Sequence, residues 1–376
     1  MKSAFIVHRS SFIILSMNIL VFGAGAVGRY IGGHLAHAGH HVTLITRSGA
    51  ERIRRQGLTI KKKRGDLFVQ PNASPSLRQA IQTADEEGRK YDLMLLTMKS
   101  YDVEGATNEI VAFYEQPPPI ITLQNGINAE RPLFEQFGNA RVVPGSLTTP
   151  VSFDANFNVV EERANRGIGL STFGSEGNKL SKQGQKLFKK AGIKTIMVKN
   201  YESLKWSKGL INMVGNATSA IINRRPSVLY RSNAIYKLEM RMLKEVLKIM
   251  NRLNIEVINL PGTPARTLKY GINSLSDRWL QPILTYQMKR GRGSKMPSFQ
   301  IDLASGKENN EVFYHNGAVA RIGREIGIAT PVNAALNDIL LDIATQKIDW
   351  DRFDGMPKEL LTTVNRYIRE ARVNNQ

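Results

Sequence analysis

The feature that most constrains this chain is the glycine spacing in VFGAGAVGRY, where Gly23, Gly25 and Gly28 form the pattern GxGxxG. The pattern directly follows an apolar run at 18–22 and opens a predicted helix that continues through His37. In this setting the first glycine permits a tight turn, the second lets the backbone approach a pyrophosphate, and the third allows close packing of helix on sheet. Unpaired N–H groups at the helix start then face the phosphates. The alternative is that the glycines serve only turns. We expect the dinucleotide to contact the whole loop, namely Gly23, Ala24, Gly25, Ala26, Val27 and Gly28.

Strand-like and helix-like segments alternate through the first half of the chain. The runs 41–46, 92–98 and 119–125 are apolar and bounded by turn or polar residues, as in strands buried on both faces. With helical stretches between them, these runs predict a parallel sheet. Residues 57–70 alternate around a Gly-Asp turn and predict a hairpin, and 193–199 predicts a last strand.

From about residue 201 the apolar residues follow helical spacing, most clearly in 201–223, 234–253 and 317–327. We therefore predict an α/β fold with two domains. A Rossmann-type dinucleotide-binding domain would span 17–199, and a mostly α-helical substrate and catalytic domain would span 200–376. We interpret residues 1–16 as a disordered leader or an extension from an upstream start site.

The end of the second predicted strand bears on the choice of cofactor. An NAD-specific site usually carries an acid there to bind the ribose 2′-hydroxyl, but this chain reads LITRSG, with no acid before Glu51. Arg47 stands in that position, and an arginine fork suits a 2′-phosphate. The sequence therefore favours NADP(H), with an exposed surface arginine as the alternative interpretation of Arg47.

Composition narrows the remaining function classes. The formal charge is +20, from 52 lysines and arginines against 32 acids, which favours anionic ligands, yet the basic runs are short and lack interleaved aromatic residues. We therefore do not expect a nucleic-acid partner.

The chain has no cysteine, and its six histidines lack metal-ligand spacing, so we expect no metal. It lacks an apolar run of the roughly 18 residues that a membrane span needs, and we expect a soluble, cytoplasmic protein. A homodimer is left open.

The segment LKWSKGLINMVGN, residues 204–216, places Lys208, Asn212 and Asn216 at four-residue steps. On one continuous helix these side chains, with Lys205, would lie opposite an apolar face that includes Trp206. By itself this pattern is that of a solvated face. The alternative is the wall of an active site, which would explain two asparagines in mid-helix, where asparagine is a poor helix former.

With the glycine loop, TMKSYD at 97–102 and LQNG at 123–126, the chain resembles the ketopantoate reductase (2-dehydropantoate 2-reductase) family from about residue 17 to 333. The resemblance implies a Rossmann domain joined to a helical domain like that of 6-phosphogluconate dehydrogenases, with the active site in the cleft between them. The segment 226–294 is longer and more basic than in the family, which leaves the exact substrate open.

The resemblance also implies roles for single residues. Lys208 and Glu311 would be catalytic. Asn125, Asn212, Asn216 and Ser298 would bind the substrate, although the spacing from Asp302 to Glu311 is one residue longer than usual and puts Ser298 in doubt. The cofactor would contact Arg47, Lys99, Asn125 and Glu311 besides the glycine loop.

A lysine close to a carbonyl oxygen can stabilise developing negative charge and donate a proton. We therefore expect NADPH-dependent reduction of a small 2-oxo acid, with 2-dehydropantoate, the precursor of pantoate in pantothenate and coenzyme A synthesis, as the leading substrate. One alternative is a reductase of the same fold for another 2-oxo acid. A second is a basic NADP-binding regulatory protein without turnover.

Overall fold

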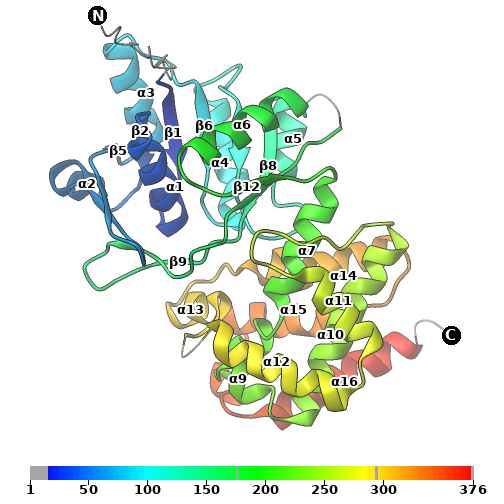
Figure 1. The fold of residues 1–376 in the computed structure, drawn as a ribbon. Helices are drawn as coiled ribbons and strands as arrows, with labels where there is room; N and C mark the ends of the chain where they lie inside the picture. Colours follow the sequence, from blue (N-terminus) through cyan, green and yellow to red (C-terminus); the bar gives the residue numbers. More distant parts are fainter. Residues whose placement is uncertain (1–15, 175–176, 293–294, 374–376) are drawn as a thin grey trace, which may run out of the picture.

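The computed structural model describes residues 16–174, 177–292 and 295–373, so our interpretation of residues 1–16 falls almost wholly outside the described residues. The chain forms a sheet-containing part followed by a helical part, and the long loops and helix α7 (Tyr201–Met213) lie where the two meet (Figure 1). The predicted α/β class, with a Rossmann-like first part and a helical second part, is confirmed.

The main sheet has eight strands in the order β12-β11-β8-β7-β6-β1-β2-β5. Six of them, from β5 to β8, run parallel, whereas β11 pairs with β8 in the antiparallel sense. The predicted parallel sheet is therefore confirmed. Its strands are β1 (Asn18–Phe22), β2 (His41–Ile45), β5 (Asn72–Ser74), β6 (Leu93–Leu96), β7 (Ile120–Thr122), β8 (Val142–Leu147), β11 (Ile168–Leu170) and β12 (Thr195–Met197).

Helices cover both faces of this sheet because its strands are apolar on both sides. Side chains alternate: Ile19 and Val21 of β1 join the cluster with α1 and α6, whereas Leu20 joins the cluster on the opposite face. The opposite face is covered by α3, α4 and α5. The helices of this part are α1 (Ala26–His37), α2 (Ala50–Gln56), α3 (Leu77–Glu86), η1 (Ser100–Asp102), α4 (Val103–Val111), α5 (Arg131–Phe137) and α6 (Asn178–Lys190).

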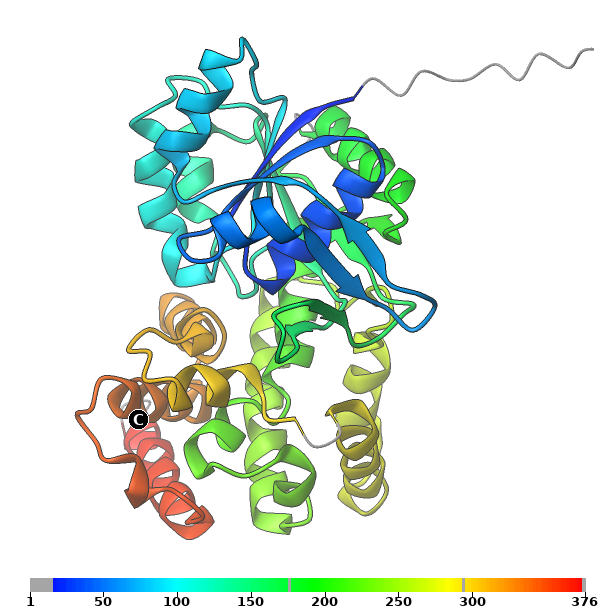
Figure 2. The same cartoon turned by 90° about the vertical axis from the view of Figure 1, so that its left-hand side faces the viewer.

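A smaller sheet of four strands projects from the first part toward the helical part (Figures 1 and 2). The predicted hairpin at 57–70 forms β3 (Leu58–Lys61) and β4 (Leu67–Val69), which pair antiparallel. Strands β9 (Val151–Phe153) and β10 (Val159–Glu161) complete this sheet, and β10 pairs with β3.

Among the described residues, all the named secondary-structure elements of the second part are helices. The helices predicted at 234–253 and 317–327 are confirmed as α10 and α14. The elements are α7 and α8 (Ala217–Ile222), α9 (Pro226–Leu229), α10 (Asn233–Arg252), α11 (Ala265–Ser274), α12 (Asp277–Arg292), α13 (Ser298–Ala304), η2 (Glu311–Tyr314), α14 (Asn316–Glu325), α15 (Pro331–Ala344), η3 (Trp350–Arg352) and α16 (Pro357–Val373).

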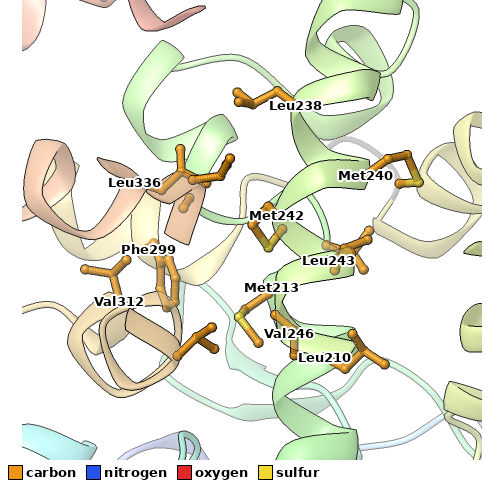
Figure 3. Close-up of a cluster of buried hydrophobic side chains, with 14 of the residues drawn as sticks. Leu210, Met213, Leu238, Met240, Met242, Leu243, Val246, Phe299, Val312 and Leu336 are labelled. Carbon is orange, nitrogen blue, oxygen red and sulfur yellow. The ribbon is translucent and has the colours of Figure 1, made fainter. Parts of the chain in front are cut away.

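One large apolar cluster holds the helical part together. Leu210 and Met213 of α7 pack beside Met242 and Val246 of α10, while Phe299 of α13 approaches from the other side (Figure 3). Fully burying one such side chain contributes roughly 1.5–3 kcal/mol. This cluster confirms the apolar face that we predicted for α7, and it fixes the helix so that its other face meets the first part of the chain.

Candidate active site

The glycine loop leaves β1 and enters α1 at the centre of the parallel sheet, with β6 on one side and β2 on the other. Gly23 has a φ of +95°, and a Cβ there would lie 2.5 Å from the backbone nitrogen of Met98. At Gly28, a Cβ would lie 2.6 Å from Oγ1 of Thr97. At Gly25 no atom lies within 4 Å of an added Cβ. Two glycines are thus required by the fold itself, and the middle one leaves open space at the start of a helix.

This open space fits the pyrophosphate of a dinucleotide. The loop is held by local hydrogen bonds: the Ala24 N–H donates to the Ile45 carbonyl at 2.8 Å, and Nε of Arg29 donates to the Ala24 carbonyl at 2.9 Å. Arg29 is buried and was not foreseen from the sequence; burial and the nearby Arg52 lower its pKa. Helix N-termini commonly bind anions through their unpaired amides, and the start of α1 adjoins this open space.

Arg47 lies exposed just beyond the end of β2, before α2 begins. Burial raises the pKa of the Asp102 carboxyl, and the positive charges of Arg47 and Lys307 act in the opposite direction. Arg47 therefore lies within electrostatic reach of Asp102 in the TMKSYD segment. The end of β2 is where the ribose of a dinucleotide lies in Rossmann folds.

A cluster of opposite charges joins the two parts of the chain. Nζ of Lys99, at the end of the loop after β6, donates to Oδ2 of Asp302 at 2.9 Å and to Oε2 of Glu311 at 3.1 Å. The Ser100 hydroxyl lies 3.1 Å from Oε1 of Glu311. Burial by itself would lower the pKa of Lys99, but Glu311 and Asp302 outweigh it and raise the pKa above its ordinary value. Lys99 is therefore cationic and fixed by two buried carboxylates.

The QNG loop packs on the same carboxylate-bearing segment. The Ile127 N–H donates to the Tyr314 carbonyl at 2.8 Å, and the Ser100 hydroxyl contacts the Asn125 carbonyl. Gly126 has a φ of +94°, and a Cβ there would lie 2.6 Å from Cβ of Tyr314. The Asn125 side chain is half-buried at this junction. Asn125 and Glu311 thus lie on touching segments, although they are far apart in the sequence.

Helix α7 ends at Met213, which corrects the prediction of one continuous helix at 201–223. Gly215 has a φ of +61°, and α8 begins only at Ala217. Lys208 and Asn212 lie on α7, but Asn216 lies after the break, so the three side chains are not in register on one helix. Asn216 is buried, and its Oδ1 accepts a hydrogen bond from the Phe299 N–H at 3.4 Å. The break aims Asn216 at the start of α13.

A solvated face at this position is excluded by burial. Lys208 is 9% exposed, Asn216 is 4% exposed and Lys205 is 2% exposed, while Asn212 is half-buried. Lys205 contacts the first part of the chain and Asn216 contacts α13 in the second part, so these side chains meet protein instead of water. The solvated-face interpretation of the segment at 204–216 is therefore wrong, and its assignment to the wall of an active site stays a prediction.

Ser298 is the predicted site residue that stands least clearly in this cluster. It is exposed at the first position of α13, next to Phe299, which contacts Asn216. Glu311, by contrast, is 2% exposed. The sequence has one residue more than usual between Asp302 and Glu311, and this stretch includes the loop that joins α13 to η2.

We did not predict a histidine at this centre from the sequence. His315 is 1% exposed, packs beside the ring of Phe299, and its Nδ1 is buried without a hydrogen-bond partner. Burial lowers its pKa to about 4; the Glu311 charge opposes this shift, whereas Lys208 adds to it. His315 is therefore neutral at physiological pH and lies within the electrostatic reach of both predicted catalytic residues. Its position directly before Asn316-Gly317 was the only available signal.

A cavity of about 610 Å³ lies beside this cluster, not within it. It is bordered by Tyr101, Tyr314 and side chains of α15 and α16, including Asp338 and Tyr367. Lys99, Asp302 and Glu311 do not line this cavity. Among the described residues, no group of three or more histidine, aspartate or glutamate side chains could hold a metal ion. Nor does any described helix have the length and apolar character that crossing a bilayer requires.

Comparison with known proteins identifies the family of this chain. Residues 19–174 match the family described as ketopantoate reductase PanE/ApbA, and residues 200–344 match its C-terminal domain. The chain belongs to the ketopantoate reductase family. Members of this family are oxidoreductases that act on a CH–OH group with a dinucleotide cofactor, and the first part of the chain has the Rossmann-like fold that binds such cofactors.

Curated relatives cover most of the chain at modest identity. A 2-dehydropantoate 2-reductase of Pyrococcus horikoshii is 27% identical over 322 residues, which is 85% of this chain and 95% of the relative. An uncharacterized oxidoreductase of Bacillus subtilis, YkpB, is 23% identical over 250 residues, 66% of this chain and 78% of the relative.

Solved structures share the fold. A PanE/ApbA family ketopantoate reductase from Ralstonia eutropha aligns with a TM-score of 0.70 at 23% identity, covering 88% of this chain and 99% of that one. A D-mandelate dehydrogenase in a ternary complex with NADH and anilino(oxo)acetate aligns with a TM-score of 0.72 at 19% identity, with the same coverage.

Proposed function

We propose that this protein uses NADPH to reduce a small 2-oxo acid, with 2-dehydropantoate as the substrate and pantoate as the product. The observation that carries the proposal is the burial of Lys208 on α7, which together with Glu311 lies within electrostatic reach of the buried His315. The names of the curated relatives support the substrate, because several are 2-dehydropantoate 2-reductases.

The bound cofactor supplies a hydride to the C2 carbonyl carbon of the oxo acid. Lys208 stabilises the negative charge that develops on the carbonyl oxygen and then donates a proton to it, which gives the hydroxyl group. The lysine regains its proton from solvent. Because Lys208 is only 9% exposed, its charge acts in surroundings where water screens it weakly.

The neighbouring polar groups would orient the oxo acid. Asn125, Asn212 and Asn216 carry amides that can bond to a carboxylate or a hydroxyl, and Asn125 lies on the loop that contacts η2. Glu311 would accept a bond from a substrate hydroxyl or hold Lys99 near the cofactor. Ser298 remains a candidate contact at the exposed start of α13.

NADPH is proposed over NADH because of the cation at the end of β2. Arg47 is exposed there, where a 2′-phosphate would lie, and no acid precedes Glu51. Glu51 forms an ion pair with Arg55 at 2.5 Å, one turn along α2, so its carboxylate is engaged on its own helix. A guanidinium pairs well with a phosphate, whereas a 2′-hydroxyl needs an acceptor.

The test is the initial rate of cofactor oxidation with 2-dehydropantoate and a panel of other 2-oxo acids, each with NADPH and with NADH. We expect the highest kcat/KM for 2-dehydropantoate with NADPH. A higher kcat/KM for a different 2-oxo acid would support the same reaction and would show that 2-dehydropantoate is not the preferred substrate. An absence of turnover together with salt-sensitive binding of nucleic acid would instead favour the regulatory protein.

A further inference from the structure

A second lysine on α7, three residues before Lys208, has no role in the chemistry above. Lys205 is 2% exposed, and its Nζ donates to the carbonyl oxygens of Gln124 at 2.9 Å and Gly145 at 2.8 Å. It also forms an ion pair with Glu130, whose carboxylate is 0% exposed. All three acceptors belong to the first part of the chain. Lys205 therefore inserts from the catalytic helix into the carboxyl-terminal edge of the main sheet.

Glu130 binds the same helix at a second point. The Tyr201 hydroxyl donates to Oε2 of Glu130 at 2.9 Å, and the Thr122 hydroxyl lies 3.4 Å from Oε1. Burial, followed by the Glu130 charge, raises the pKa of Tyr201 well above its ordinary value. Tyr201 and Lys205 are one turn apart on α7, so one buried carboxylate fixes the rotation of that turn as well as its distance from the sheet.

The groups that Lys205 holds are directly linked to the proposed site. Gln124 precedes Asn125 in the QNG loop, and Lys208 follows Lys205 by about one turn. The bond from Nζ of Lys205 to the Gln124 carbonyl thus joins the helix that carries the proposed acid to the loop that carries a proposed substrate ligand. Across the same loop, the Ile127 N–H is bonded to the Tyr314 carbonyl at 2.8 Å.

Stability alone is a weak explanation for such a pair. The desolvation of two charges offsets much of the free energy that their attraction contributes. Apolar residues of similar volume often stabilise a core equally well. A lysine at this position forms three directed polar contacts to three separate elements, which an apolar side chain cannot form. Directed bonds specify a relative position, which packing alone fixes less strictly.

We propose that the buried Lys205–Glu130 pair is a positioning device that holds α7 against the QNG loop, so that Lys208 and Asn125 face the same bound oxo acid. Lys205 is a positioning residue, not a catalytic one. This inference rests on the proposed function for its catalytic consequence, while its structural part concerns the free protein.

The kinetic test compares Lys205→Met with Lys199→Met, an exposed lysine just before α7, at saturating NADPH. For Lys205→Met we expect kcat with 2-dehydropantoate to fall at least tenfold and KM to rise, while the Kd for NADPH stays within twofold of wild type. Lys199→Met should match wild type in all three. An unchanged kcat in a folded Lys205→Met protein would overturn the proposal.

A double variant separates positioning from stability and covers the case in which Lys205→Met fails to fold. Lys205→Met with Glu130→Leu removes both buried charges, so no unpaired charge remains. We expect its Tm to return toward that of wild type while kcat stays at least tenfold reduced. Recovery of both Tm and kcat would mean that the pair serves stability only, and would refute the inference.

Amide hydrogen exchange in the cofactor-free protein tests the device even if the proposed reaction is wrong. The Ile127 amide reports the bond between the QNG loop and η2. We expect faster exchange over 124–130 in the double variant than in Lys199→Met, at matched global stability. Equal exchange would overturn the positioning role, whereas a wild-type protein that reduces no 2-oxo acid would overturn only the proposed function.

Discussion

Replacing Gly25 by alanine should separate cofactor binding from folding. The backbone of Gly25 has a φ of −71°, which alanine adopts without strain, and no atom lies within 4 Å of the added Cβ. We therefore expect the stability of the free protein to change by at most about 0.5 kcal/mol. The methyl group would, however, occupy the space through which the pyrophosphate approaches the backbone. An overpacking cost of about 1–3 kcal/mol corresponds to NADPH binding that is weaker by about 5- to 150-fold.

Gly28→Ala is the matched control because its cost falls on the fold. The added Cβ would lie 2.6 Å from Oγ1 of Thr97 and 2.7 Å from the Gly23 carbonyl, and these two atoms are themselves bonded at 2.8 Å. Since neither can move freely, we expect a loss of about 1–3 kcal/mol in the free protein. Thermal unfolding without cofactor and titration of NADPH fluorescence measure the two effects. Wild-type affinity in Gly25→Ala would refute the assignment of the open space to the pyrophosphate.

Two further predictions concern the cofactor and the pH dependence of stability. Arg47→Ala should weaken NADPH binding by about 2 kcal/mol, the value of a hydrogen bond to a charged group, and leave NADH binding unchanged. Arg64→Ala, which replaces an exposed arginine in the turn between β3 and β4, is the control, and equal losses for both cofactors would count against the 2′-phosphate contact. His34 donates to the Ala191 carbonyl through Nδ1 at 3.0 Å, its Nε2 is buried without a partner, and burial lowers its pKa to about 4. The unfolded chain binds a proton at this histidine near pH 6.5, whereas the folded protein binds it only near pH 4. The free energy of unfolding therefore decreases as the pH falls from 6.5 toward 4, by about 2 kcal/mol at pH 5. His34→Asn should flatten this loss in thermal unfolding between pH 7.5 and 5, and an unchanged slope would exclude His34 as its source.

The parts of the fold that were predictable depend on local pattern. Strands buried on both faces produce apolar runs, and the glycine spacing requires a strand before it and a helix after it, so β1, β2, β6 and α1 were predicted close to their observed bounds. The length of α10 followed from an apolar period kept over twenty residues. These signals are contained within single segments.

The site depended on contacts that no single segment contains. A helical wheel assumes that the face opposite the core meets water, but α7 packs on both sides, so Lys205 was grouped with a polar face although it is fully enclosed by Gln124, Gly145 and Glu130. The break in α7 did have a local signal, because Gly215 followed by Asn216 favours a turn. His315 had only the adjacent Asn316-Gly317 pair as a signal, since its packing against Phe299 depends on contacts between separate segments.

The central claim is that Lys208 donates the proton in a hydride-transfer reaction. The direct test is the rate of NADPH oxidation with 2-dehydropantoate for wild type and Lys208→Ala, alongside the Kd for NADPH of each protein. We expect turnover in wild type, a loss of at least 100-fold in kcat for Lys208→Ala, consistent with the size of general acid catalysis, and an unchanged Kd for NADPH. Near wild-type turnover by a Lys208→Ala protein that binds NADPH normally would contradict the central claim.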